Sequence, residues 1–253
     1  MARKADHVAA VQADLHNRGW LPRYGTAPGT GPDRRRTRQP DRLRIRQAEG
    51  VSSSLFIKIC GLKTERDVDT AVEAGADAVG FVFSASPRRI DAATAARLCA
   101  RVPENVLTVG VFRDEPLRDV RSLATASGIR AVQLHGPEDR GYYDDLATGG
   151  WTLIRAAAFG EPAPRHGDMG EDVLLLDAPV PGSGVAWDWS RKPLAGPGEK
   201  WLLAGGLTPD NVRAAVDATS PWGVDVSSGV ERSRGVKDPA LITAFVGAAR
   251  NRP

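Results

Sequence analysis

Residues 55–60 read Leu55-Phe56-Ile57-Lys58-Ile59-Cys60, and Gly61 follows directly. This stretch is short and almost wholly apolar, which is typical of a strand buried on both faces of a parallel sheet. Seven more runs of the same kind follow along the chain: Ala78–Phe83, Leu107–Phe112, Ala131–Leu134, Trp151–Ala158, Val173–Asp177, Trp201–Ala204 and Gly223–Val226. The sequence therefore predicts eight buried strands.

Amphipathic stretches separate many of these strands. Helices are expected over Thr64–Ala74, Ala92–Arg101, Pro116–Ser127, Pro209–Ala218 and Asp238–Arg250. Asp91 is a typical N-cap, and Thr208-Pro209 would place proline at the first helical position. Eight strands alternating with helices within about 200 residues favour an α/β fold of the (β/α)8 (TIM) barrel type over an open doubly wound sheet. The Pro- and Gly-rich segment Gly160–Glu171 predicts that the helix after the fifth strand is missing or vestigial.

Composition narrows the class of protein. The chain has 253 residues, 42% of them hydrophobic, which supports one substantial core. It contains no run of 18 uncharged apolar residues and no apolar segment behind the N-terminal charges, so we expect neither a membrane span nor a secretory signal. Two cysteines make no disulfide framework and favour a reduced, cytoplasmic setting. No CxxC pair accompanies the four scattered histidines, so no metal site is expected.

The charge is distributed unevenly. Of 34 Lys+Arg and 31 Asp+Glu, residues 1–50 hold 11 and 5, which leaves 23 and 26 in residues 51–253. The first part is thus net +6 and the rest net −3. We interpret 1–50 as a basic, disordered extension, or as upstream sequence included by an early start site, and 51–253 as the barrel. The alternative is a basic arm for nucleic acid, but no aromatic residues alternate with its arginines as stacking platforms would.

The active site of such a barrel forms at the carboxyl ends of the strands. After the seventh and eighth predicted strands, the loops contain Gly205-Gly206 and Ser227-Ser228-Gly229. Glycines let backbone amides approach an anion closely, and serines add hydroxyl donors. These two loops therefore predict a phosphate site.

Two further strand ends carry reactive side chains. Cys60 ends the first strand, where nearby positive charge could make it a thiolate base or nucleophile, whereas Cys99 lies inside a helical stretch and reads as a small buried hydrophobe. Asp177 ends the run Val173–Asp177, and a carboxylate behind three leucines is costly unless it is solvated, paired or used. A structural ion pair and a general acid are both open for Asp177. Together, Cys60 and Asp177 would form a base and an acid on opposite sides of a phosphosugar.

Four motifs in order resemble the phosphoribosylanthranilate isomerase family over residues 56–250. They are Phe56-Ile57-Lys58-Ile59-Cys60-Gly61-Leu62, the segment from Gly75 to Phe83 with Ser86-Pro87-Arg88, Val132-Gln133-Leu134-His135-Gly136, and Val224-Asp225-Val226-Ser227-Ser228-Gly229-Val230-Glu231. The resemblance implies an Amadori rearrangement of N-(5-phosphoribosyl)anthranilate in tryptophan biosynthesis, with no cofactor. It also implies that the partner is a phosphosugar, with no nucleic acid or membrane, and that the enzyme is a monomer or homodimer.

The resemblance also implies a role for each matching residue. Asp177 would protonate the furanose ring oxygen, and Cys60 would remove the proton on sugar C2. Arg88 would hold the anthranilate carboxylate, and Gln133, His135 and Asp225 would contact the substrate. Gly205, Gly206, Ser227, Ser228 and Gly229 would bind the phosphate.

Some residues depart from the family pattern, and other functions are open. Pro179–Trp189 keeps glycines and a Trp-Asp-Trp ending but has proline near the acid, and Arg89 stands where an aromatic residue is common. One alternative is an isomerase of the histidine-pathway ProFAR substrate, alone or bifunctional. Those barrels use aspartate at the first strand end, so Cys60 favours the tryptophan substrate. A second alternative is a non-catalytic phosphosugar-binding barrel. Loss of Cys60, Asp177 or Arg88 would favour it, and all three residues are present.

Overall fold

The computed structural model describes residues 54–160, 164–178 and 197–250. Eight parallel strands pair in sequence order, and β1 also pairs with β8, so the sheet closes into a barrel. The strands are β1 (Phe56–Cys60), β2 (Ala78–Val82), β3 (Leu107–Phe112), β4 (Ala131–Leu134), β5 (Thr152–Ala158), β6 (Val173–Asp177), β7 (Trp201–Leu203) and β8 (Gly223–Val226). The predicted fold class is confirmed, and all eight strands lie at the predicted positions.

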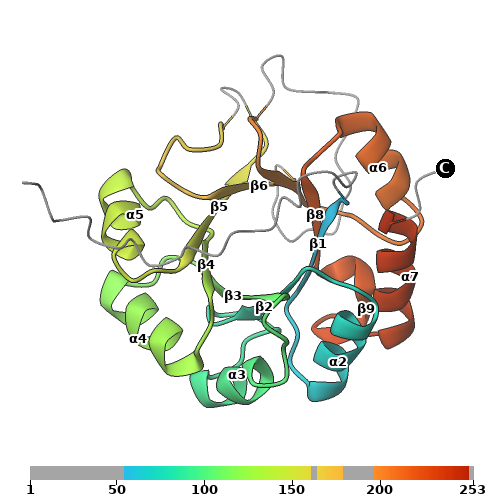
Figure 1. The fold of residues 1–253 in the computed structure, drawn as a ribbon, viewed down its shortest axis with the longest axis horizontal. Coiled ribbons are helices and arrows are strands. Elements are labelled where there is room, and N and C mark those ends of the chain that lie inside the picture. The colour runs from blue at the N-terminus through green and yellow to red at the C-terminus, as the bar shows by residue number, and fades with distance from the viewer. Residues whose placement is uncertain (1–53, 161–163, 179–196, 251–253) are drawn as a thin grey trace, which may run out of the picture. The chain divides into compact units, whose positions relative to one another are not determined.

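Helices form an outer ring around the strands (Figure 1). They are α2 (Glu65–Glu73), α3 (Ala92–Cys99), α4 (Leu117–Ser127), α5 (Arg140–Ala147), α6 (Val212–Thr219) and α7 (Pro239–Arg250). Five of them were predicted, and α5 is an addition. Within the described part of the chain, no helix has both the length and the apolar character that a membrane crossing requires.

The period-two alternation of the strands divides the core into two layers. Side chains that point outward, such as Ile57, Ile59 and Phe81, pack against the helices and form the larger cluster. Side chains that point inward, such as Leu107, Val109 and Ile154, fill the barrel interior. The barrel is therefore a packed core, and only the inward-facing residues nearest the carboxyl ends of the strands can reach a ligand.

Two predicted helix starts had different outcomes. The Asp91 side chain accepts a hydrogen bond from the Thr94 backbone N–H at 2.7 Å, so the predicted N-cap of α3 is confirmed. The start predicted at Thr208-Pro209 is wrong, because α6 begins at Val212. The Asn211 side chain accepts from the Thr208 N–H at 2.8 Å and donates to the Gly206 carbonyl at 2.9 Å. These two bonds fold the segment before the helix into a turn.

No helix occurs between β5 and β6 in the part of this connection that the structure describes, residues 159–160 and 164–172. This agrees with the prediction from Gly160–Glu171. Arg155 anchors the connection: its Nε donates to Glu171 at 3.0 Å and its Nη2 to the Arg165 carbonyl at 2.7 Å. The Glu171 carboxylate has no solvent exposure and also accepts from the Met169 N–H. An ion pair and backbone hydrogen bonds thus replace helix packing here.

A small hairpin follows β8. The short 3-10 helix η1 (Ser228–Val230) leads into β9 (Glu231–Ser233), which pairs antiparallel with β10 (Val236–Lys237) before α7 begins. The sequence analysis did not predict these two short strands. They bring Glu231 and Lys237 to the edge of the barrel mouth.

The Arg155–Glu171 pair generates a stability prediction. We expect Glu171→Gln to lower the free energy of unfolding by about 3 kcal/mol, because the largely buried Arg155 loses its buried carboxylate partner and keeps only the half-exposed Asp168. Urea denaturation monitored by circular dichroism would measure the loss.

Asp168→Asn is the matched control. Asp168 is about half exposed and lies 3.6 Å from Arg155, so its loss is expected to cost less than about 1 kcal/mol. Equal losses for the two variants would show that Glu171 has no special part in anchoring the connection.

Candidate active site

The inward-facing positions at the carboxyl ends of the strands bring the chemistry-bearing residues to one mouth. Lys58 and Cys60 alternate on β1 with the outward-facing Ile57 and Ile59, so both point inward. Cys60 packs with Val82 and Val111 at the top of the interior. The last residue of β6 and a residue of β8 supply the two carboxylates, Asp177 and Asp225.

A buried ion pair lies one layer below the thiol. The Lys58 ammonium has no solvent exposure and donates to Asp225 Oδ1 at 2.7 Å, across the seam where β1 meets β8. Burial disfavours the ammonium, but the Asp225 carboxylate and the hydrogen-bonded Cys60 thiol outweigh it and raise the pKa of Lys58. Lys58 therefore stays protonated directly beneath Cys60.

Burial and neighbouring charges shift the pKa of the Cys60 thiol in opposite directions. Burial raises the pKa of the Cys60 thiol, and the Lys58 ammonium is the strongest influence that opposes this rise. Asp225 raises the pKa further, and Lys237 lowers it. A thiolate at this position is thus favoured by two buried cations and opposed by burial, which is the larger influence.

Asp177 is a buried carboxyl at the opposite side of the mouth. Burial raises its pKa to about 6, in spite of a hydrogen bond from the Ala178 N–H at 2.8 Å. The Asp225 carboxylate adds to the rise, and Lys58 opposes it. A carboxyl with this pKa is partly protonated near neutral pH, which suits it to give a proton and take it back.

Two polar side chains from the fourth strand and its end point into the same region. Gln133 is almost fully buried, and its Oε1 has no hydrogen-bond partner in the described residues. His135 Nε2 lies 3.5 Å from Asp177 Oδ2, too far for a well-formed hydrogen bond, and likewise lacks a partner in the described part of the chain. Burial and the Arg113 and Lys58 cations lower the pKa of His135, so its ring is neutral near pH 7. Both side chains are available to a ligand.

The two predicted phosphate loops come together beside Asp177. A small cavity of about 70 Å³ is lined by residues of both loops, among them Gly205, Gly206, Ser227 and Ser228. Gly205 has φ +86°, and a Cβ there would lie 2.5 Å from the Ala178 nitrogen. A Cβ at Gly229 would lie 1.8 Å from the Leu207 carbonyl oxygen, so the loops touch where no side chain fits.

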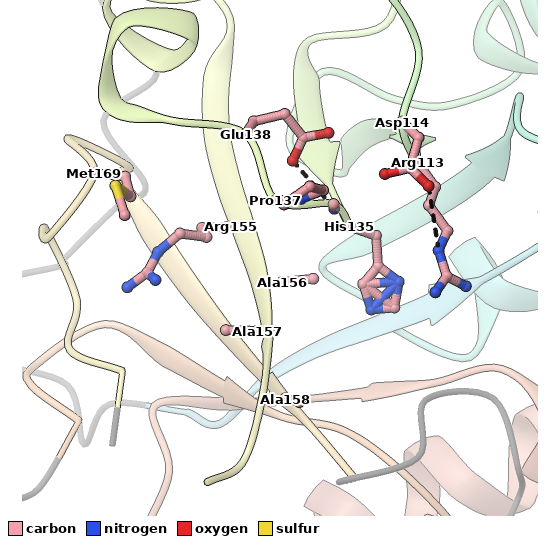
Figure 2. Close-up of a pocket in the computed structure, with 11 residues that line it drawn as sticks. Arg113, Asp114, His135, Pro137, Glu138, Arg155, Ala156, Ala157, Ala158 and Met169 are labelled. Atoms are coloured by element: carbon pink, nitrogen blue, oxygen red, sulfur yellow. Dashed lines mark hydrogen bonds and ion pairs between the residues drawn. The ribbon is translucent and has the colours of Figure 1, made fainter. Parts of the chain in front are cut away.

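A larger hollow of about 470 Å³ lies over the ends of β3, β4 and β5. It is lined by Arg113, Asp114, His135, Gly136, Pro137, Glu138, Arg155, Ala156, Ala157, Ala158 and Met169. Figure 2 shows the side chains of Arg113, His135 and Arg155 around this hollow. Neither Cys60 nor Asp177 lines it. His135 lines this hollow and also lies 3.5 Å from Asp177. The hollow is therefore additional space next to the site that contains Cys60 and Asp177.

Arg88 lies in the loop after β2 and is held by a residue from the far end of the chain. Its Nε donates to Glu231 Oε1 at 2.7 Å and its Nη2 to Glu231 Oε2 at 3.0 Å. Arg88 is thus part of the mouth, as the sequence analysis expected, but one edge of its guanidinium is already engaged. Arg89, the neighbouring arginine, is exposed.

The structure brings most of the predicted site residues into one mouth and adds three others. Asp225, predicted to contact substrate, gives one carboxylate oxygen to Lys58 and also lines the small cavity. Lys58 was not predicted, although a lysine at an inward position of an apolar strand is a usable signal, since it must find a carboxylate. Glu231 and Lys237 gave no such signal, because their partners are distant in sequence or lie in an unpredicted hairpin. Pro179–Trp189 lies outside the described residues, as does the extension 1–50.

Comparisons with known proteins agree with this geometry. A sequence model of the N-(5'phosphoribosyl)anthranilate (PRA) isomerase family matches residues 57–248. An N-(5'-phosphoribosyl)anthranilate isomerase from Roseiflexus sp. (strain RS-1) is 44% identical over an alignment of 209 residues, and the alignment covers 77% of this chain and 97% of that protein. The crystal structure of TrpF from Jonesia denitrificans superposes with a TM-score of 0.70 at 44% identity and covers 78% of this chain and 97% of that one.

One solved relative contains a ligand. It is a phosphoribosyl anthranilate isomerase in complex with reduced 1-(o-carboxyphenylamino)-1-deoxyribulose 5-phosphate, with a TM-score of 0.67 and 36% identity. The match covers 77% of this chain and 98% of that chain.

The raised pKa of Asp177 predicts a gain in stability when the carboxyl is removed. The folded state keeps the Asp177 proton up to about pH 6, whereas an unfolded chain releases it near 3.9, so the folded state binds more protons between these values. The free energy of unfolding therefore falls as pH rises through this window. Asp177→Asn does not titrate, and we expect it to be more stable than the parent by up to about 3 kcal/mol above pH 6.

Urea denaturation between pH 4 and 8 would measure this difference. The advantage of Asp177→Asn is expected to become small near pH 4, where the folded carboxyl is protonated and the unfolded one is about half protonated. A difference that does not change with pH would contradict the assigned pKa.

Proposed function

Since the chain belongs to the N-(5′-phosphoribosyl)anthranilate isomerase family, we propose that Cys60 and Asp177 are the base and the acid that isomerise its substrate. The enzyme is an aldose–ketose isomerase of tryptophan biosynthesis. Its reaction opens the ribose ring of N-(5′-phosphoribosyl)anthranilate and moves two protons. The product is 1-(2-carboxyphenylamino)-1-deoxyribulose 5-phosphate.

The first step uses the protonated form of Asp177. The Asp177 carboxyl donates its proton to the furanose ring oxygen, the bond from that oxygen to C1 breaks, and the nitrogen lone pair forms a protonated C1=N Schiff base. The pKa of about 6 supports this role, because a fraction of the carboxyl stays protonated at neutral pH. His135, neutral and close to Asp177, can contact the opened sugar without competing for the proton.

The second step uses Cys60. Its thiolate removes the proton on C2, the C–H electrons form C1=C2, and the C=N electrons return to nitrogen. The enolamine then takes a proton at C1 and loses the proton of its C2 hydroxyl, which leaves a ketone at C2 and completes the isomerisation. Lys58 supports this step as the buried cation that favours the thiolate, and Asp225 keeps Lys58 protonated.

The two ends of the substrate would be held by different loops of the mouth. The loops with Gly205-Gly206 and Ser227-Ser228-Gly229 offer backbone amides and hydroxyls to the phosphate. Arg88 offers a charge-assisted contact to the anthranilate carboxylate. Gln133, whose side-chain oxygen has no partner in the described residues, and Asp225, which lines the small cavity, would contact the sugar hydroxyls.

The observation that carries the proposal is the combination of a buried thiol over an ammonium with a carboxyl of raised pKa in the same mouth. A silent phosphosugar-binding barrel would not need either group. We further propose that the enzyme works in the cytoplasm, and as a homodimer, since a relative from Thermotoga maritima is described as dimeric.

Removal of either group is expected to abolish most of the activity. Cys60→Ser and Asp177→Asn should each lower kcat by about 10²–10⁴-fold, the range typical of a general base or acid. The loss of phosphoribosylanthranilate fluorescence would follow the reaction, with circular dichroism as the check on folding. Near-parent turnover by a folded variant would remove that residue from its role.

The same parent protein should be assayed with ProFAR. Turnover of phosphoribosylanthranilate with none of ProFAR is the expected result. Comparable turnover of both would favour the bifunctional alternative, and turnover of neither would favour the non-catalytic barrel.

Lys58→Met should move the ionisation of Cys60 to higher pH. Methionine fills a similar volume but removes the ammonium that opposes the raised thiol pKa. The pH dependence of iodoacetamide alkylation, measured in a Cys99→Ala background, reports the thiolate directly. The acidic limb of kcat/KM should shift in the same direction, and Lys58→Arg should retain part of the effect. An unchanged alkylation profile in Lys58→Met would contradict the role of Lys58.

A further inference from the structure

The contact between Arg88 and Glu231 has a specific geometry. Glu231 binds the guanidinium side-on, through Nε at 2.7 Å and Nη2 at 3.0 Å. No other hydrogen bond to this guanidinium occurs within the described residues. A side-on pair leaves the end-on edge, formed by Nη1 and the second hydrogen of Nη2, as a free planar fork. That fork matches the two oxygens of a second carboxylate.

Glu231 is itself held from two further directions. Lys237 Nζ donates to Oε1 at 2.9 Å, and the Gly235 N–H donates to Oε2 at 3.0 Å. The Glu231 side chain is almost fully buried, and so is that of Lys237. Four donors thus fix one carboxylate, and its orientation fixes the guanidinium of Arg88 in turn.

The hairpin connects this cluster to the rest of the site. Lys237 Nζ also donates to the Ser227 carbonyl at 2.8 Å, and the Ser227 hydroxyl donates to the Cys60 carbonyl at 3.2 Å. The cluster therefore joins the β2 loop that carries Arg88 to the β8 loop of the phosphate site. A change in the hairpin is expected to alter the position of Arg88 more than the position of the phosphate loop.

The cluster of Arg88, Lys237 and Glu231 has a net charge of +1. Arg88 and Lys237 are two cations, and Glu231 is one carboxylate, whose hydrogen bonds with Arg88, Gly235 and Lys237 outweigh burial and hold its pKa at about 2. Glu231 is therefore ionised at every working pH and never competes for a proton in the reaction. The remaining positive charge suits one external anion.

From this geometry we infer that Glu231 is a positioning residue: it holds Arg88 side-on so that the end-on edge of the guanidinium recognises the carboxylate of the substrate. Lys237 assists by fixing Glu231. The inference rests on the proposed function, in which Arg88 binds the anthranilate carboxylate. It makes the hairpin of β9 and β10 a determinant of specificity for a carboxylated aromatic amine, and it places no part of the hairpin in the proton transfers.

A pair of stable ligands tests this inference. The first is reduced 1-(o-carboxyphenylamino)-1-deoxyribulose 5-phosphate, and the second is the same compound without its carboxylate. Calorimetry would measure both Kd values for the parent, Glu231→Gln and the double variant Glu231→Gln/Lys237→Met, which also removes the buried ammonium. Arg234→Ala, an exposed position in the same hairpin, is the matched control.

We expect Glu231→Gln to weaken binding of the carboxylated ligand about tenfold, which corresponds to about 1.4 kcal/mol, and binding of the other ligand less than twofold. The double variant should show the same pattern as Glu231→Gln. In both variants, KM for phosphoribosylanthranilate should rise by a larger factor than kcat falls. Arg234→Ala should bind both ligands as the parent does. Equal weakening of both ligands would show a merely structural role, and no weakening of either would show that Glu231 does not position Arg88. Both results overturn the inference. A parent enzyme that does not turn over phosphoribosylanthranilate would instead overturn the proposed function.

Discussion

Pairing of β1 with β8 closes the barrel, and the surroundings of Cys60 depend on that seam. Lys58 lies directly opposite Asp225 in the register of these two strands, so closure itself creates the buried ion pair beneath Cys60. The Ser227 hydroxyl, just past the end of β8, donates to the carbonyl of Cys60 at the end of β1. An open sheet would leave the first and last strands at opposite edges, and Lys58 beneath Cys60 would lack its carboxylate partner Asp225.

Most charged side chains of the mouth contact a group of opposite charge. Lys58 with Asp225 is a neutral pair below the thiol, and Arg88, Glu231 and Lys237 form a cluster with one positive charge over. Asp177 differs, because burial raises its pKa and Lys58 offsets only part of this rise. Buried ions are stable only when a partner offsets their lost hydration. Below about pH 6 Asp177 avoids that cost by holding a proton, and that proton is the one that the proposed first step uses.

The strands and most helices could be predicted from the sequence, because buried parallel strands and amphipathic helices have distinct apolar periods. The described residues between β5 and β6 form no helix, which proline and glycine in the sequence predicted, whereas the Arg155–Glu171 anchor in its place could not be predicted. The start of α6 was misplaced, since the usual meaning of Pro209 was overridden by hydrogen bonds from the Asn211 side chain. Local rules fail where a side chain reaches back to the backbone of a neighbouring turn.

The sequence by itself determined the barrel and the strand ends at which chemistry must lie, and it predicted that Cys60, Asp177, Arg88 and two phosphate loops form the site. Only the tertiary structure decided the partners of these residues: Lys58 beneath Cys60, Asp225 beside Lys58, and Glu231 behind Arg88. Periodicity is a local property, because it follows from the backbone geometry of each element. The pKa of a thiol or carboxyl and the direction of a guanidinium depend on charges that are far apart in the chain, and closure of the barrel brings them together, as it does Lys58 and Asp225 across 167 residues.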